Sequence, residues 1–233
     1  GEKLTLRQLL FLLLVTEDDR AAMVIARGLA GDYATFVGWM NERSAEWGMT
    51  NSHWGNPHGL DNAETYSTAY DIAIAARNAM ADPIFADVVS YSDAVIAGHW
   101  VLSTNELLTT YPGAVGIKTG TTDNAGQCLA AMVDRVSGKA LTVVMGSSDR
   151  FLDTRLLMDH YYDNYAVLTI DLPQTDQNRY LDEEGNWREF RLERPVALLI
   201  KPWQVGTARA YRRIDTLSAN PDASAPIGAL EIT

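Results

Sequence analysis

Three residues at Lys118-Thr119-Gly120 combine a positive charge, a hydroxyl and a glycine shortly before an apolar run over 126–133. Such a run is typical of a β-strand. The ammonium and the hydroxyl can both donate hydrogen bonds, and the glycine lets a ligand backbone approach closely. The Pro112-Gly113 pair upstream predicts a turn that leads the chain into this segment. These residues together predict a strand edge that binds an anion.

Further segments occur in a fixed order before this strand. They are Tyr33–Asn41, Asn51–Asp61, Tyr66–Asp71 and Thr104–Leu108. The most distinctive combination is Asn56-Pro57-His58-Gly59-Leu60-Asp61 followed by Tyr111–Thr121. In this order, over about residues 1–165, the chain resembles the serine D-alanyl-D-alanine carboxypeptidases, the small penicillin-binding proteins of bacterial cell-wall metabolism. The resemblance implies an α/β (α+β) fold: a five-stranded antiparallel sheet with helices on both faces and a helical subdomain beside it.

The resemblance also implies a site in which three elements meet: Ser-x-x-Lys, Ser-x-Asn and Lys-Thr-Gly. The first serine attacks the carbonyl between two D-alanines and forms an acyl-enzyme, which water releases. Lys118 matches the residue that holds the terminal carboxylate and helps to move protons, and Thr119 adds a hydroxyl donor. Gly120 leaves room for the substrate, and the backbone N–H of Thr121 matches an oxyanion-hole donor.

Partners and location follow from the same resemblance. It implies peptidoglycan stem peptides ending in D-Ala-D-Ala as substrates, β-lactams as ligands, and no metal or cofactor. It places the protein outside the cytoplasm, in the periplasm or at the cell surface, with any membrane anchor outside this chain. The formal net charge of −11 argues against nucleic acid, because phosphate binding needs a basic stripe.

The nucleophile is missing from the sequence, because no Ser-x-x-Lys occurs in the 233 residues. We expect this motif to precede Gly1, in a chain that is cut at both ends. The chain as given is then unable to carry out the acylation.

The second element is also altered. Matching the helix that starts at Arg20 without gaps puts Glu17-Asp18-Asp19 where the family has Ser-x-Asn, so Glu17 and Asp19 join Lys118 as candidate catalytic residues. A match shifted by one residue places Thr16 and Asp18 there instead. A carboxylate near Lys118 competes with the substrate's own carboxylate, which predicts weak catalysis. The alternative interpretation is an acidic helix N-terminus favoured by the helix dipole.

Composition and periodicity predict one large and one small domain. With 47% apolar residues a packed core is expected, and the single Cys128, interpreted as a core residue, excludes an internal disulfide. We predict a carboxypeptidase-like domain over 1–167 and a small β-rich domain over 168–233, with strands over 196–200 and 229–232. The apolar runs 126–133 and 140–147 predict a β-hairpin.

Helix start signals add the remaining elements. Thr5 and Gln8 have the spacing of a capping box, Asp32 can cap a third helix, and Ser67 is predicted to cap a fourth. The predicted helices cover 5–14, 20–29, 32–47, 68–80 and 150–165, whereas 88–91 and 95–102 are interpreted as strands or an irregular crossing.

Three functions remain open at this point. The first is a serine D-Ala-D-Ala carboxypeptidase. The second is a penicillin-binding-like pseudoenzyme that binds muropeptides or cell-wall partners without turnover. The third is a related β-lactamase or amide hydrolase, since these enzymes share Lys-Thr-Gly-type strands.

Overall fold

The computed structural model describes residues 2–171, 178–182, 184–192, 195–214 and 228–232. The chain forms two compact units, Gly1–Tyr161 and Tyr162–Thr233. The predicted domain boundary after residue 167 falls inside strand β6 (Ala166–Ile170), and the assignment of 168–233 as a separate domain stays a prediction.

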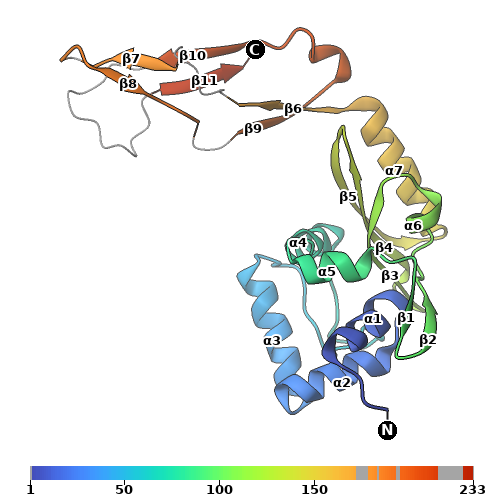
Figure 1. Cartoon of the computed structure of the whole chain (residues 1–233). Coiled ribbons are helices and arrows are strands. Elements are labelled where there is room, and N and C mark those ends of the chain that lie inside the picture. Colours follow the sequence, from blue (N-terminus) through green and yellow to red (C-terminus); the bar gives the residue numbers. More distant parts are fainter. Residues whose placement is uncertain (1, 172–177, 183, 193–194, 215–227, 233) are drawn as a thin grey trace. The chain divides into compact units, whose positions relative to one another are not determined.

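The first unit begins with helices and continues with strands (Figure 1). The helices are α1 (Leu6–Thr16), α2 (Asp19–Ala30), α3 (Tyr33–Glu46), α4 (Ala69–Ala79) and α5 (Pro83–Val89). They are followed by β1 (Asp93–Ile96), β2 (His99–Leu102), α6 (Leu107–Thr110), β3 (Ala114–Thr122), β4 (Gly126–Arg135), β5 (Gly138–Ser147) and α7 (Arg150–Asn164).

Local polar residues set the ends of the first helices as predicted. Thr5 and Gln8 form both contacts of the capping box at the start of α1. Asp32 caps α3 by accepting a hydrogen bond from the backbone N–H of Thr35 at 2.8 Å. Gly31 ends α2 with a φ of 84°, a conformation that glycine adopts without a Cβ penalty.

The predicted cap of α4 is wrong by one residue. Thr68, not Ser67, is the N-cap, and its hydroxyl accepts from the backbone N–H of Asp71 at 3.1 Å. The Ser67 hydroxyl lies 2.8 Å from the hydroxyl of Ser52 instead. Adjacent hydroxyl residues are equivalent cap signals in a sequence, and the tertiary contact with Ser52 decides between them.

Between α4 and α6 the structure differs from the prediction at residues 88–91, whereas strands over 95–102 are found. Residues 83–89 form helix α5, because Asp82 caps it and Pro83 occupies its first turn, where no N–H is needed. Residues 93–102 form a tight hairpin in which Ile96 pairs with His99. The two residues between them, Ala97 and Gly98, both have positive φ, at 50° and 83°, as a two-residue hairpin turn requires.

Strands β3, β4 and β5 form one antiparallel sheet in that order. The predicted hairpin over 126–133 and 140–147 is confirmed by the pairing of Val133 with Ala140. The predicted turn before β3 is confirmed as well, because the N–H of Ala114 donates to Tyr111 O at 3.1 Å and Gly113 has a φ of 84°. The implied five strands are not found: among the described residues this sheet has three, and β1 and β2 form a sheet of their own.

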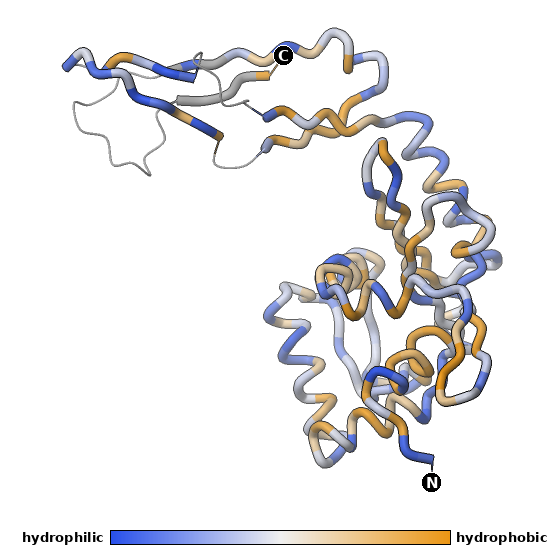
Figure 2. Tube along the Cα trace, in the orientation of Figure 1, coloured by the Kyte–Doolittle hydropathy of each residue, from blue (hydrophilic) through white to orange (hydrophobic). Residues whose placement is uncertain are grey.

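Two apolar clusters hold the helices of the first unit. Helices α4 and α5 pack on the sheet through Ala76, Val89, Ile117 and Ala130. Helix α1 packs on α5 and the β1–β2 hairpin, and the residues of this second cluster are Phe11, Val15, Val88, Ile96 and Val101. Figure 2 shows the hydrophobic colouring of α1 and of β3–β5. This packing fixes the C-terminal end of α1 close to β3, and the N–H of Thr104 donates to Val15 O at 3.1 Å.

The second unit contains short antiparallel strand pairs. Strand β6 pairs with β9 (Val196–Ile200), β7 (Arg179–Leu181) with β8 (Trp187–Glu189), and β10 (Ala210–Ile214) with β11 (Gly228–Ile232); a 3-10 helix spans Pro202–Gln204. The strands predicted over 196–200 and 229–232 are confirmed. Within the described parts of both units, every helix is too short or too polar to cross a bilayer.

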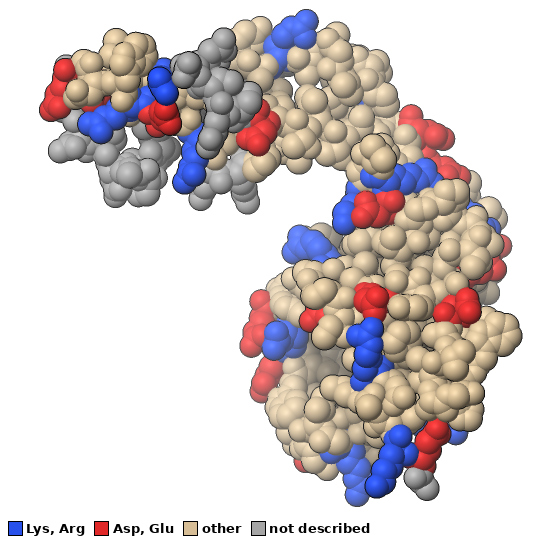
Figure 3. All heavy atoms as spheres, viewed as in Figure 1, with Lys and Arg blue, Asp and Glu red and all other residues tan. Residues whose placement is uncertain are grey.

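Charges of both signs are interspersed over the face of the molecule seen in Figure 3. Exposed ion pairs of this kind, such as Arg43 with Glu46 at 3.2 Å, contribute little. The charged residues that decide chemistry are therefore those that are partly withdrawn from water.

Candidate active site

Glu17 sits at the junction of the first two helices in an unusual backbone conformation. It is the C-cap of α1 with a φ of 61° and a ψ of 33°, which is the left-handed region. The next residue, Asp18, donates its N–H to Leu12 O at 3.0 Å and caps α2 by accepting from Arg20 N at 2.9 Å. A residue with a Cβ costs on the order of 1 kcal/mol in this conformation, so neighbouring contacts must hold Glu17 there.

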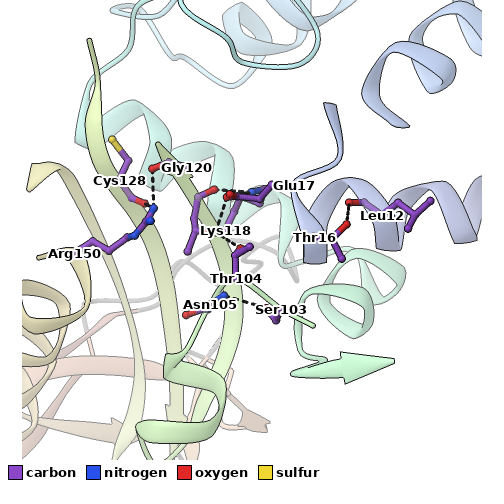
Figure 4. A network of polar contacts seen from close by, with 11 residues as sticks. Leu12, Thr16, Glu17, Ser103, Thr104, Asn105, Lys118, Gly120, Cys128 and Arg150 are labelled. Atoms are coloured by element: carbon purple, nitrogen blue, oxygen red, sulfur yellow. Dashed lines mark hydrogen bonds and ion pairs between the residues drawn. The ribbon is translucent and has the colours of Figure 1, made fainter. Parts of the chain in front are cut away.

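Those contacts come from β3, about 100 positions later in the chain. The Nζ of Lys118 donates to Glu17 Oε1 at 2.6 Å, and the Oγ1 of Thr119 donates to the same oxygen at 2.6 Å. Figure 4 shows Glu17, after the end of α1, and Lys118, on β3, lying against each other. The Nζ of Lys118 also donates to Thr119 O at 2.6 Å. One carboxylate oxygen thus receives an ammonium and a hydroxyl from adjacent residues.

The hydroxyl of Thr104 extends this network. It lies within hydrogen-bond distance of the Thr119 hydroxyl. Because the single proton of Thr119 points to Glu17, Thr104 must donate its own proton to Thr119. The loop between β2 and α6 therefore orients the hydroxyl that faces the carboxylate.

Burial and charge act in opposite directions on this pair, whose side chains are 31% exposed for Glu17 and 30% for Lys118. Burial by itself raises the pKa of the Glu17 carboxyl, but hydrogen bonds from Lys118 and Thr119 and the nearby positive charge of Arg150 lower it below its ordinary value. Burial lowers the pKa of the Lys118 ammonium, and this outweighs the opposing effect of Glu17. The lysine is thus easier to deprotonate than a lysine in water.

Arg150 is a second cation at the site that the sequence motifs did not indicate. Its Nη1 donates to Gly120 O at 2.8 Å and to Cys128 O at 3.2 Å, so the first residue of α7 reaches across β3 and β4. Its charge favours the ionised form of Glu17 and disfavours that of Lys118. No spacing pattern links Arg150 to Lys118, so only the folded chain shows their proximity.

The remaining predicted residues surround this contact. Gly120 faces open space, since a Cβ built there meets nothing within 4 Å among the described atoms apart from its chain neighbours. Thr121 is exposed and pairs with Gln127 on β4. Asp19 begins α2, and its charge favours the ionised form of Lys118 without a direct contact.

The structure places Glu17 against Lys118, rather than the residues of the shifted match. The hydroxyl of Thr16 donates back to Leu12 O at 2.7 Å within α1. The carboxylate of Asp18 caps α2 and pairs with Arg20 at 2.8 Å, as the helix-terminus interpretation predicts for that residue.

The Asn56–Asp61 segment forms a compact loop near the C-terminal end of β3. Asn56 holds the turn from both sides, because its Oδ1 accepts from Gly59 N and its Nδ2 donates to Leu60 O, both at 2.7 Å. Asp61 Oδ2 accepts from the N–H of Asn124, in the β3–β4 turn, at 3.1 Å. The loop is thereby tied to the strand that carries Lys118.

Metal ligands and the single cysteine are the remaining groups to consider at the site. Within the described ranges, no cluster of three or more His, Cys, Asp or Glu side chains has a geometry that could hold a metal ion. Cys128 is partly exposed rather than fully buried, and its Sγ lies 3.6 Å from Ala125 O.

The chain is similar to known proteins in sequence and in fold. A sequence profile of the D-alanyl-D-alanine carboxypeptidase family matches residues 1–149. The chain belongs to this family. D-alanyl-D-alanine carboxypeptidase DacF of Bacillus subtilis is 31% identical over 211 residues, which are 86% of this chain and 54% of that protein. The chain spans about half the length of the curated relatives it matches.

Solved structures confirm the fold class, a penicillin-binding type of antiparallel sheet flanked by helices. Penicillin-binding protein 5 of Haemophilus influenzae matches with a TM-score of 0.81 at 22% identity, over 95% of this chain and 67% of that one. This likeness concerns the fold alone. Penicillin-binding protein D2 of Listeria monocytogenes, solved in an ampicillin-bound form, matches with a TM-score of 0.64 at 27% identity, over 68% of each chain.

Proposed function

We propose that the chain is part of a serine D-Ala-D-Ala carboxypeptidase that acts on peptidoglycan stem peptides outside the cytoplasm. The observation that carries the proposal is the convergence of Lys118 Nζ and Thr119 Oγ1 on one carboxylate oxygen, each at 2.6 Å. Here the carboxylate of Glu17 stands in for the terminal carboxylate of the peptide. Membership of the family supports the same reaction.

The reaction assigns a role to each part of the site. A serine from a segment outside these 233 residues bonds to the carbonyl carbon between the two D-alanines, and its proton passes to a base. The C–N bond then breaks, the departing D-alanine amine takes up a proton, and water releases the acyl group. Lys118 and Thr119 hold the carboxylate, Gly120 leaves space along the strand, and the N–H of Thr121 faces the developing oxyanion.

A β-lactam fits the same donors, because penicillins carry a carboxylate close to their reactive amide carbonyl. The ampicillin-bound form of the Listeria monocytogenes protein supports this ligand class for the present chain. Fluorescent penicillin is therefore a direct probe of the proposal.

The test uses the whole protein that carries Ser-x-x-Lys. Fluorescent penicillin labels the wild type covalently, and Lys118→Met lowers the rate of labelling on the order of 100-fold, the scale of losing one preorganised donor. Lys139→Met is the matched control, because Lys139 is exposed on the β4–β5 hairpin and pairs with Asp134. Equal labelling of wild type and Lys118→Met refutes the proposed role of the lysine, and absence of any labelling refutes the enzyme.

A catalytically inactive protein that binds muropeptides is the second candidate, and the Glu17 contact favours it. A carboxylate where the family has a serine removes a neutral donor and already engages Lys118. The discriminating experiment measures D-alanine release by the whole protein before and after Glu17→Ser with Asp19→Asn. Activity that appears only in the double variant supports the inactive protein, whereas activity in the wild type excludes it.

A further inference from the structure

We propose that Glu17 is a tethered internal ligand that occupies the carboxylate subsite and must leave it before a peptide carboxylate can bind. This inference concerns the regulation of the site and rests on the proposed function of Lys118 and Thr119. It differs from inactivity, because a tethered ligand can be displaced.

The first argument is that Glu17 already occupies the hydrogen-bond donors of Lys118 and Thr119. The hydroxyl of Thr119 has one proton, and Glu17 accepts it. The ammonium of Lys118 has three protons, of which one goes to Glu17 and one to Thr119 O. An incoming carboxylate that needs both side chains finds the hydroxyl engaged, so it binds only where Glu17 has moved away.

The second argument is the tether. The backbone on both sides of Glu17 is held, because Glu17 is the C-cap of α1, Asp18 is the N-cap of α2, and Asp18 makes contacts at both helix ends. These backbone contacts do not involve the Glu17 side chain, which is 31% exposed to water. The carboxylate can therefore leave Lys118 without any change of fold.

The third argument is the charge around the contact. Lys118 on β3 and Arg150 on α7 supply two positive charges, and Glu17 and Asp19 supply two negative charges. With Glu17 in place the positive charge of the subsite is balanced internally. Removing the Glu17 charge leaves a surplus of one positive charge at the subsite.

The test compares a carboxylate ligand with its neutral analogue on this chain, in which no Ser-x-x-Lys occurs. Binding of N-acetyl-D-alanyl-D-alanine and of its C-terminal amide is followed by the amide NMR shifts of residues 118–121. Glu17→Gln removes the charge and keeps the size. Glu17→Gly removes the side chain and relieves the positive φ, which keeps the chain folded.

We expect both variants to bind the carboxylate about tenfold more tightly than the wild type, the scale of one charge-assisted contact with part-exposed partners. Binding of the amide stays the same in all proteins. Glu46→Gln is the matched control, because Glu46 is an exposed carboxylate on α3 and its loss changes nothing at the subsite.

Two results overturn the inference, and they differ. A wild type that binds the carboxylate as tightly as both variants shows that Glu17 does not compete, and leaves the proposed subsite intact. A Glu17→Gly variant that binds the carboxylate ligand no more tightly than the amide ligand shows that Lys118 and Thr119 do not form a carboxylate subsite. In that case the proposed function fails together with the inference.

Discussion

Replacing Lys118 by Met should reverse the direction in which the pKa of Glu17 is shifted. In the wild type, burial raises this pKa, and the hydrogen bonds and charges of Lys118, Thr119 and Arg150 more than offset the effect. Lys118→Met removes the strongest of these favourable contacts and leaves the burial. The pKa of Glu17 should then rise above its ordinary value of 4.5.

The cost in stability follows from the distance and the exposure. Unit charges 2.6 Å apart attract by about 6 kcal/mol at an effective dielectric of 20, before the cost of removing both groups from water. Losing one partner of a fully buried pair costs about 3 to 5 kcal/mol, and exposed pairs contribute about 1 or less. With roughly a third of each side chain exposed, we expect Lys118→Met to lower the free energy of unfolding by about 2 kcal/mol at pH 7.

The stability difference between the wild type and Lys118→Met should depend on pH. Because the pKa of Glu17 is lowered in the folded wild type, its contribution is present above pH 4.5 and is lost as the pH falls through the lowered pKa. In Lys118→Met the raised pKa makes ionised Glu17 destabilising at pH 7. The difference between the two proteins should therefore begin to shrink as the pH falls through the raised pKa of Glu17 in the variant, and it should be smallest below the lowered pKa in the wild type.

The assay is a titration of the Glu17 carboxyl by ¹³C NMR, together with urea unfolding at pH 7 and pH 4. Glu17→Gln in the Lys118→Met background should recover most of the lost stability, because no charge is then left unpaired. Arg43→Met is the control, since it breaks an exposed pair with Glu46 and should leave stability unchanged. A Glu17 pKa that stays below 4.5 in Lys118→Met, or a double variant as unstable as the single one, refutes the reasoning.

Two further predictions concern the surroundings of β3. Tyr111 donates to Asp159 at 2.6 Å, and burial together with this carboxylate raises its pKa to about 12. The contribution of the Tyr111 hydroxyl to stability should therefore be complete below pH 10 and be lost as the pH rises towards 12. Tyr111→Phe should lower the free energy of unfolding in urea by about 1 to 2 kcal/mol. In an ultraviolet titration the same variant should lack the tyrosine that ionises at about pH 12. Gly113→Ala should cost about 2 to 3 kcal/mol, because a Cβ would lie 2.9 Å from Asp134 O at a positive φ. Gly31→Ala, at the same φ with nothing within 4 Å, should cost only about 1 kcal/mol, and equal losses in the two variants would contradict the steric argument.

The helix caps and the turn before β3 could be predicted because their partners are only a few residues apart. The Thr5 and Gln8 capping box and the Pro112-Gly113 turn are read directly from neighbouring residues. The same signals failed where a distant contact intervened. Ser67 is an equally good cap by sequence, but its hydroxyl is engaged with Ser52 and Thr68 takes the position.

The family could be predicted from the sequence alone, because the motifs around Lys118 specify residue types in a fixed order. The anion site at Lys118 stays a prediction. The identity of the group that faces Lys118 was decided only by the tertiary structure. Two matches were open for the Ser-x-Asn element, and the packing of α1 on α5 and the β1–β2 hairpin brings Glu17 to the lysine. Arg150 likewise reaches the site only because α7 returns across the sheet after β5. Local hydrogen bonds join residues a few positions apart, so they can be predicted from the sequence. The contact between residues 17 and 118 forms only when apolar packing has brought α1 and β3 together.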